Sequence, residues 1–159
     1  ALVKAAPTQA AAIDTRARAY TARLAALDAR ARAAFDAIPR EQRRVVSTHD
    51  AFGYLGEAYG VSFIAPRSWN TESEASAAGV AAVIRELRRH QAHALFVENI
   101  TDRRSIERIA QETGARVGGT LYSDALSLPG TEADSYLRLV RHNVQTLAGA
   151  MRAALTASR

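Results

Sequence analysis

Residues 44–55 read RVVSTHDAFGYL, a run rich in β-branched residues that changes abruptly into a pattern typical of a helix. The β-branched residues favour an extended strand, and Asp50 is suited to open a short helix after it. This change leaves His49 at the carboxyl end of the predicted strand. Ligands of open α/β sheets bind at that end of the strands, so His49 is the first candidate for a functional side chain.

The rest of the chain repeats this alternation of strand and helix. Strand-like runs are expected at residues 44–48, 61–65, 94–98 and 116–121. Helices are expected at residues 50–59, after the capping-box sequence at 71–74, at 102–113 and from about 133 to 156. Strands that alternate with helices form parallel sheets through right-handed crossovers. The sequence therefore predicts an α/β fold with a four-stranded parallel sheet flanked by helices.

One long helix is expected before the sheet. Residues 8–38 carry large apolar side chains at steps near three and four, which places them on one helix face. Thr8 is suited to cap this helix and Pro39 to end it. About thirty residues at ~1.5 Å each give roughly 45 Å, more than a domain of this size needs. The helix either packs along the domain or joins it to a second lobe. We divide the chain into a helical segment, 1–43, and an α/β lobe, 44–159.

The composition indicates a globular chain with a basic charge. The 159 residues are 48% hydrophobic and 23% charged, with a formal net charge of +5 and no cysteine. The lack of cysteine excludes disulfides and thiolate metal sites, and no apolar run reaches the length of a membrane span. All basic residues except Lys4 are arginine, spread along several helices among acidic residues. This spread favours a solvated surface over a nucleic-acid interface.

The parallel arrangement predicts that the residues after each strand gather along one edge of the sheet. Asp124 follows the fourth strand as His49 follows the first, and Glu98 ends the third. A neutral imidazole and a carboxylate suit a divalent cation such as zinc, although two ligands do not complete a protein site. A surface or packing role is expected for the other imidazoles, those of His90, His93 and His142.

The pattern alone also allows roles for these residues that involve no metal. His49 could cap the following helix, and Asp124 could start a turn with Ser123. The two could also serve acid–base catalysis in a hydrolase or transferase, with a nearby serine as the nucleophile. The sequence has no G-x-S-x-G elbow, phosphate-binding glycine loop or paired-histidine protease helix to support this. A third alternative is an interaction module on the basic long helix, with salt-sensitive binding to acidic partners.

Several stretches taken together resemble one protein family. They are STHDAFGYL at 47–55 with AYGV at 58–61, TESEASA at 71–77, LFVENI at 95–100, GTLYSDAL at 119–126, and YL at 136–137 with RHNV at 141–144. In this order they are similar to the C-terminal lobe of the periplasmic metal-binding proteins of ABC importers, nearest to the zinc-binding ZnuA and AztC type. The resemblance covers essentially the whole chain.

The resemblance implies a protein of two α/β lobes, joined by one long helix, with the metal between them. Residues 8–38 would be this linking helix, His49 the third metal ligand and Asp124 the fourth, with Glu98 beside the ligands. A histidine in the third position, where manganese importers often have glutamate, favours zinc over manganese. The other two histidine ligands would belong to an N-terminal lobe that is absent here. We therefore expect a C-terminal portion that carries half of the metal site.

The function implied by the resemblance is metal binding without catalysis. Such a protein captures zinc in the periplasm and delivers it to the membrane permease of the importer. A metal-delivering periplasmic protein is a second candidate partner, and no nucleic acid is expected. The half site predicts weak zinc binding, with water or a neighbouring molecule completing the shell. Binding should weaken at low pH, because His49 must be neutral to coordinate a metal.

Overall fold

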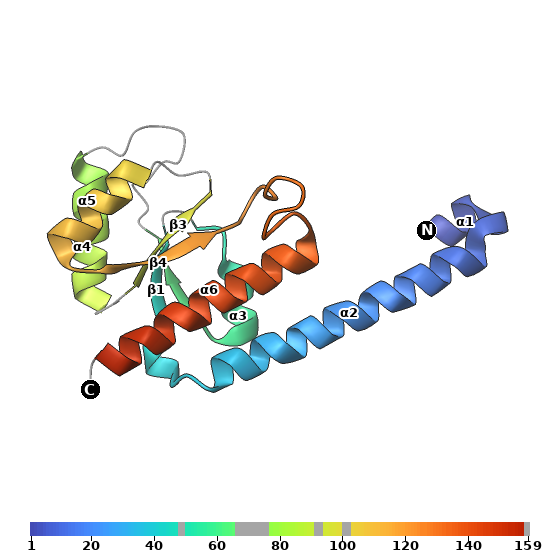
Figure 1. Cartoon of the computed structure of the whole chain (residues 1–159), viewed down its shortest axis with the longest axis horizontal. Helices are drawn as coiled ribbons and strands as arrows, with labels where there is room; N and C mark the ends of the chain where they lie inside the picture. The colour runs from blue at the N-terminus through green and yellow to red at the C-terminus, as the bar shows by residue number, and fades with distance from the viewer. Residues whose placement is uncertain (48–49, 66–76, 91–93, 100–102, 158–159) are drawn as a thin grey trace.

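A four-stranded parallel sheet forms the centre of the lobe, and a long helix projects from it (Figure 1). The structure, a computed structural model, describes residues 1–47, 50–65, 77–90, 94–99 and 103–157. The strands are β1 (Arg44–Ser47), β2 (Ser62–Ile64), β3 (Ala94–Glu98) and β4 (Arg116–Leu121), in the order β2-β1-β3-β4. Each neighbouring pair is parallel. The predicted α/β class and sheet are confirmed.

Helices cover both faces of the sheet (Figure 1). On one face lie α2 (Ala10–Asp36), α3 (Gly53–Tyr59) and α6 (Tyr136–Ala157), and on the other lie α4 (Ala77–His90) and α5 (Arg103–Thr113). Successive residues of β3 alternate between the two cores: Ala94 and Phe96 pack with α2 and α6, whereas Leu95 and Val97 pack with α4 and α5. Burial on both faces is typical of a central strand in a parallel sheet.

Two helices begin later than the sequence predicts. The prediction that Thr8 caps the long helix is wrong, because Thr8 lies within the 3₁₀ turn η1 (Pro7–Gln9) and the cap of α2 is Gln9. Pro7, with its fixed φ, opens that turn before the α-helix starts. Asp50 does not open α3 either. The carbonyl of Phe52 accepts the first bond of α3, from the Gly56 N–H at 2.8 Å.

The long helix is anchored to the lobe near its carboxyl end. Its 27 residues correspond to roughly 40 Å at ~1.5 Å each. The buried residues of α2 are Ala31 and Phe35, both in its last two turns, whereas Tyr20 is exposed. The amino-terminal part of α2 runs well beyond the lobe and ends near the short helix α1 (Leu2–Ala5) (Figure 1).

Buried Arg43 joins the carboxyl ends of α2 and α3. It follows the 3₁₀ turn η2 (Arg40–Gln42). Its Nε donates to the Ile38 carbonyl at 2.8 Å, and its Nη1 donates to the Tyr59 carbonyl at 3.0 Å. Its Nη2 lies 3.6 Å from the Asp36 carboxylate. The guanidinium thus binds the last carbonyl of α3 and a carbonyl two residues beyond the end of α2.

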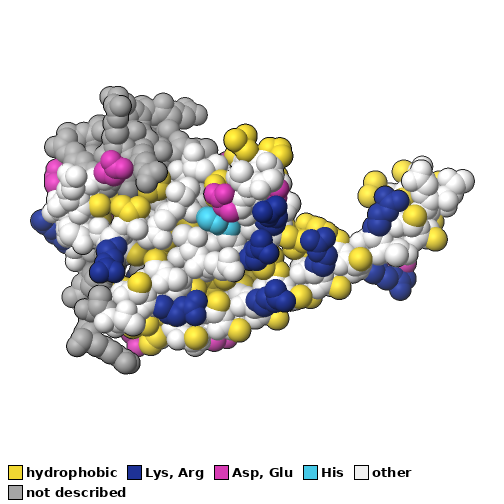
Figure 2. Space-filling model, viewed as in Figure 1, with side chains coloured by type: hydrophobic (Ala, Val, Ile, Leu, Met, Phe, Trp, Pro, Cys, Tyr) yellow, Lys and Arg dark blue, Asp and Glu magenta, His cyan; other side chains and the backbone are white. Residues whose placement is uncertain are grey.

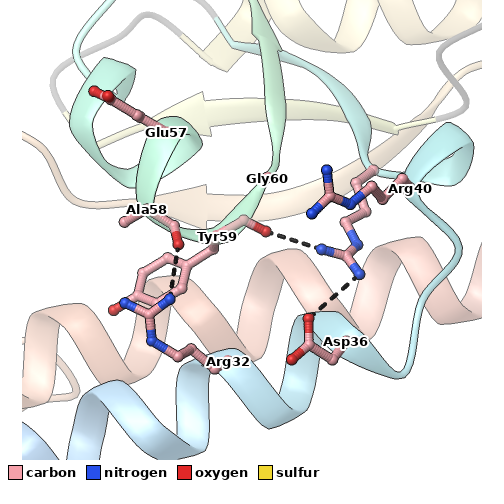
Figure 3. A pocket seen from close by; sticks show the side chains of 8 residues that line it. Arg32, Asp36, Arg40, Glu57, Ala58, Tyr59 and Gly60 are labelled. Atoms are coloured by element: carbon pink, nitrogen blue, oxygen red, sulfur yellow. Dashed lines mark hydrogen bonds and ion pairs between the residues drawn. The ribbon is translucent and has the colours of Figure 1, made fainter.

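A cavity of about 200 Å³ lies between these helix ends and is lined by Arg32, Arg40 and Arg43 among others (Figure 3). Arg32 donates to the Ala58 carbonyl at 3.3 Å, and its guanidinium lies 5.6 Å from the centroid of the Tyr59 ring. Helix carboxyl ends carry partial negative charge, which these cations offset. Because α2 and α3 end just before β1 and β2 begin, the cavity lies at the amino edge of the sheet, opposite the predicted site.

Charged side chains are spread over the long helices. Basic side chains lie at intervals along α2 and α6, separated by apolar and uncharged ones (Figure 2). Within α2, Arg18 pairs with Asp14 and Arg32 pairs with Asp28, each four residues apart. Exposed pairs at this spacing contribute only a few tenths of a kcal/mol. This distribution is typical of a solvated helical surface.

Candidate metal site

The carboxyl ends of three strands lie side by side at one edge of the sheet. Strand β3 pairs with β1 on one side and with β4 on the other. Glu98, the last residue of β3, pairs with Leu121 at the end of β4, whereas Ser47, which ends β1, pairs with Phe96, two residues before Glu98. Strands β3 and β4 end at the residues that the sequence predicts.

Two of the three predicted site residues lie in the described part of the chain. His49 lies outside the described residues, so its position and its role as a ligand stay predictions. Asp124 is exposed and lies three residues beyond the end of β4. Glu98 is buried, with 1% of its surface exposed. The structure thus presents one exposed carboxylate and one buried carboxylate at the carboxyl edge.

A short hydrogen bond links the end of β3 to the loop that carries Asp124. The Ser123 hydroxyl donates to Oε2 of Glu98 at 2.6 Å. A buried carboxyl group is costly unless hydrogen bonds compensate for lost water, and this bond supplies part of that compensation. Ser123 immediately precedes Asp124, so Glu98 restrains the backbone next to the exposed carboxylate. From the sequence, Ser123 was considered as a turn residue or as a nucleophile of the enzyme alternative, and this bond was not predicted.

Helix α6 binds the same loop through His142 and Asn143. Nε2 of His142 lies 2.9 Å from the Thr120 carbonyl, and the imidazole packs edge-on against the Tyr122 ring with 5.2 Å between centroids. The packing role expected for this histidine agrees with these contacts. Asn143 bonds to the Tyr122 backbone. The sequence signal for both was the RHNV stretch at 141–144, which contributed only to the family resemblance.

The electrostatics of the loop depend on a bond between Tyr122 and Glu132. The Tyr122 hydroxyl donates to Oε1 of Glu132 at 2.7 Å. This bond lowers the pKa of Glu132 below its ordinary value, and the charges of His142 and Arg138 add to the effect. The same bond is the main cause that raises the pKa of Tyr122. Glu132 is exposed, so the surrounding water weakens the contribution of this pair to stability.

Further along, the loop is closed by its own hydrogen bonds. The Ala133 N–H donates to Oγ of Ser127 at 2.9 Å, and the Ser127 N–H donates to the Ala133 carbonyl at 3.2 Å. The Gly130 N–H donates to the Asp134 carboxylate at 2.8 Å. Within the described part of the chain, no three His, Asp or Glu side chains are grouped to hold a metal ion.

The chain belongs to the family described as "Zinc-uptake complex component A periplasmic", which matches residues 1–150. It is 32% identical to the zinc-binding protein TroA of Treponema pallidum, over 94% of this chain and 50% of that protein. It is 34% identical to the manganese-binding lipoprotein MntA of Bacillus subtilis, with the same two coverages. The family resemblance seen in the sequence is confirmed.

Solved structures show the same relationship. The periplasmic zinc-binding protein TroA from Treponema pallidum matches with a TM-score of 0.82 at 32% identity, over 94% of this chain and 56% of that one. A manganese-bound mutant of a periplasmic metal-binding protein from Candidatus Liberibacter asiaticus matches with a TM-score of 0.81 at 26% identity, with the same coverages. The chain spans about half the length of the relatives it matches, and its fold is that of one lobe of TroA-like binding proteins.

Proposed function

We propose that this chain is the C-terminal portion of a solute-binding protein of an ABC metal importer and contributes His49 and Asp124 to a metal site. The family match gives the class of protein. One structural observation supports the site: exposed Asp124 directly follows a residue that is hydrogen-bonded to buried Glu98, at the carboxyl edge of the sheet. Ligands of open α/β sheets bind at this edge.

Zinc is the proposed metal, in preference to manganese. The matched relatives are named for different metals: zinc for TroA, manganese for MntA and iron for MtsA of Streptococcus pyogenes. Family membership therefore supports a transition metal without choosing one. The choice of zinc rests on His49, because imidazole nitrogen suits zinc whereas manganese prefers oxygen ligands.

Glu98 is proposed to act beside the ligands. Its burial and its bond to Ser123 suit a group that orients a neighbouring ligand. Groups of this kind fix the geometry of metal sites and often strongly affect affinity. In this proposal Glu98 restrains the backbone next to Asp124.

The complete protein is proposed to capture zinc outside the cytoplasmic membrane and to release it to a membrane permease. Relatives are named as periplasmic proteins or as substrate-binding lipoproteins of ABC transporters, which supports this location and partner. Among the described residues, none of the helices combines the length and the apolar character that a bilayer span requires. Transfer requires only exchange of ligands. The relatives named here are all binding proteins, so they do not favour the alternative of a hydrolase or transferase.

Zinc titration of single-site variants tests the proposal. His49→Ala should remove most of the zinc affinity of the chain and Asp124→Ala should weaken it, as measured by competition with a chelating dye. His90→Ala and Asp14→Ala are matched controls, because α4 ends at His90 at the opposite edge of the sheet and Asp14 lies on the projecting helix. Unchanged zinc affinity in both His49→Ala and Asp124→Ala would contradict the assigned site. Ester or phosphate hydrolysis that is lost in His49→Ala would favour the enzyme alternative.

A further inference from the structure

Asn143 on α6 forms two hydrogen bonds to a single residue just beyond β4. Its Oδ1 accepts from the Tyr122 N–H at 3.0 Å, and its Nδ2 donates to the Tyr122 carbonyl at 2.8 Å. Asn143 is buried, with 2% of its surface exposed. Because it binds both backbone groups of one residue, its amide pairs with Tyr122 as a residue of a neighbouring antiparallel strand would.

This pairing occurs where the chain leaves the sheet. Just beyond the paired residues of β3 and β4, the Asn99 N–H donates to the Leu121 carbonyl at 3.0 Å. At the next residue, Tyr122, the side chain of Asn143 takes the place of a neighbouring strand. The direction of the backbone toward Ser123 and Asp124 is therefore set by a helix side chain.

Asn143 occupies a position where an apolar residue would suit the helix better. Asparagine has a lower helix propensity than leucine, and its neighbours Val144 and Leu147 belong to the apolar core. A buried amide without partners destabilises a fold, whereas this one is bonded on both sides. Its bonds to Tyr122 account for an amide at this position.

We propose that Asn143 is a positioning residue for Asp124, an inference that rests on the proposed metal site. With the backbone of Tyr122 held by Asn143 and the Ser123 hydroxyl held by Glu98, the two residues before Asp124 are fixed from two elements. Asp124 therefore has fewer conformations to lose when it binds a cation. Fixing a binding group in advance increases affinity by lowering this entropic cost.

A double-mutant cycle between Asn143 and Asp124 tests the inference. Asn143→Leu removes both hydrogen bonds at similar side-chain volume and should weaken zinc binding about tenfold, the lower end of the effect of groups that orient ligands. In the Asp124→Ala background the same substitution should cause no further loss, because a positioning residue acts through the residue that it positions. Zinc affinity is measured by dye competition on the full chain, and folding by thermal unfolding.

Met151→Ala is the control for a general loss of stability. Met151 is buried in the same helix, and truncating it should clearly lower the temperature of thermal unfolding. It should leave zinc affinity unchanged at temperatures where the variant is folded. If Asn143→Leu does not fold, Asn143→Ser, which keeps a small polar side chain that is too short for both bonds, replaces it in the cycle.

The outcomes separate this inference from the proposed function. Loss of affinity in Asn143→Leu that disappears in the Asp124→Ala background supports the inference. Weakened binding in Asp124→Ala with normal binding in Asn143→Leu overturns the inference and leaves the site intact. A loss that persists in the Asp124→Ala background, or an equal loss in Met151→Ala, also overturns it. Unchanged binding in Asp124→Ala overturns the inference and removes Asp124 from the site, and the whole site is contradicted if His49→Ala also leaves binding unchanged.

Discussion

Buried polar side chains have different roles at the two edges of the sheet. At the amino edge, Arg43 donates to carbonyls at the ends of two helices and joins α2 to the lobe. At the carboxyl edge, Glu98 and Asn143 bond to the two residues before Asp124. The buried side chain at the amino edge joins helices, whereas those at the carboxyl edge hold the loop that carries exposed Asp124. Substitutions should therefore reduce stability at the first edge and metal affinity at the second.

Arg43→Met should have the largest effect on stability. It leaves the carbonyls of Ile38 and Tyr59 without the guanidinium that binds them. Each unsatisfied carbonyl costs about 1–3 kcal/mol. Because water reaches part of this region, the free energy of unfolding should fall by about 2–4 kcal/mol in total. Zinc affinity should stay within about twofold of the original protein, because the edges are separate. Urea unfolding and zinc titration measure the two quantities.

The matched control for Arg43 is Arg40→Met. Arg40 lines the same cavity but is exposed, so its loss should change stability by no more than about 0.5 kcal/mol. Equal effects of the two substitutions would show that Arg43 does not anchor the helix ends. A large fall in zinc affinity in Arg43→Met would show that the two edges are coupled.

Glu98→Gln should have the opposite effects, with a small loss of stability and a larger loss of zinc affinity. The substitution keeps the shape of the side chain and an acceptor for the Ser123 hydroxyl, so stability should fall by only about 1 kcal/mol. A neutral acceptor restrains Ser123 less firmly, and zinc affinity should fall several-fold, up to about tenfold. The control is Glu57→Gln, which changes an exposed carboxylate at the amino edge and should alter neither quantity. Normal zinc binding in Glu98→Gln would remove Glu98 from the proposed site.

The sequence predicted the sheet well because its signals are local. Residues 94–98 and 116–121 were predicted as strands with the bounds observed. Helix starts were less predictable. Thr8 and Asp50 have the chemistry of caps, but each lies before the true start of its helix, at a position set by Pro7 or by the Phe52 carbonyl. Residue type alone does not reveal which carbonyl begins a helix.

The contacts around Asp124 depend on packing that the sequence does not reveal. Asn143 and Tyr122 are 21 residues apart and meet only because α6 lies close to β4. Two glycines permit this approach: a Cβ at Gly118 would lie 3.1 Å from Cβ of Ala150, and one at Gly119 would lie 2.7 Å from Cγ2 of Thr146, both on α6. The sequence excluded a phosphate loop at this glycine pair, but its packing role could not be predicted without the position of the helix. By contrast, the order of strands and helices was enough to place Glu98 and Asp124 at one edge.

Tyr122→Phe should have the smallest effect and should be confined to the carboxyl edge. Removing the hydroxyl removes the main cause of the lowered pKa of Glu132, which should rise toward its ordinary value of 4.5. A carboxyl group whose pKa is lowered by folding stabilises the protein above its ordinary pKa, and this contribution is lost as pH falls through the lowered value. The stability difference between the original protein and Tyr122→Phe should therefore be small at pH 7 and vanish in acid. Urea unfolding at several pH values measures it.

Asp28, near the amino edge, is a control carboxylate that shows whether Tyr122→Phe acts locally or on the whole lobe. The pKa of Asp28 is lowered mainly by its bond to Arg32 and further by a hydrogen bond from Tyr59. Tyr122→Phe should leave the titration of Asp28 unchanged while that of Glu132 moves, as observed by NMR of the side-chain carboxyl carbons. Shifts in both groups would mean that the substitution disturbs the whole lobe. A shift in Glu132 alone would show that the polar contacts of the two edges act independently, as the separation of Arg43 from Asn143 and Glu98 implies.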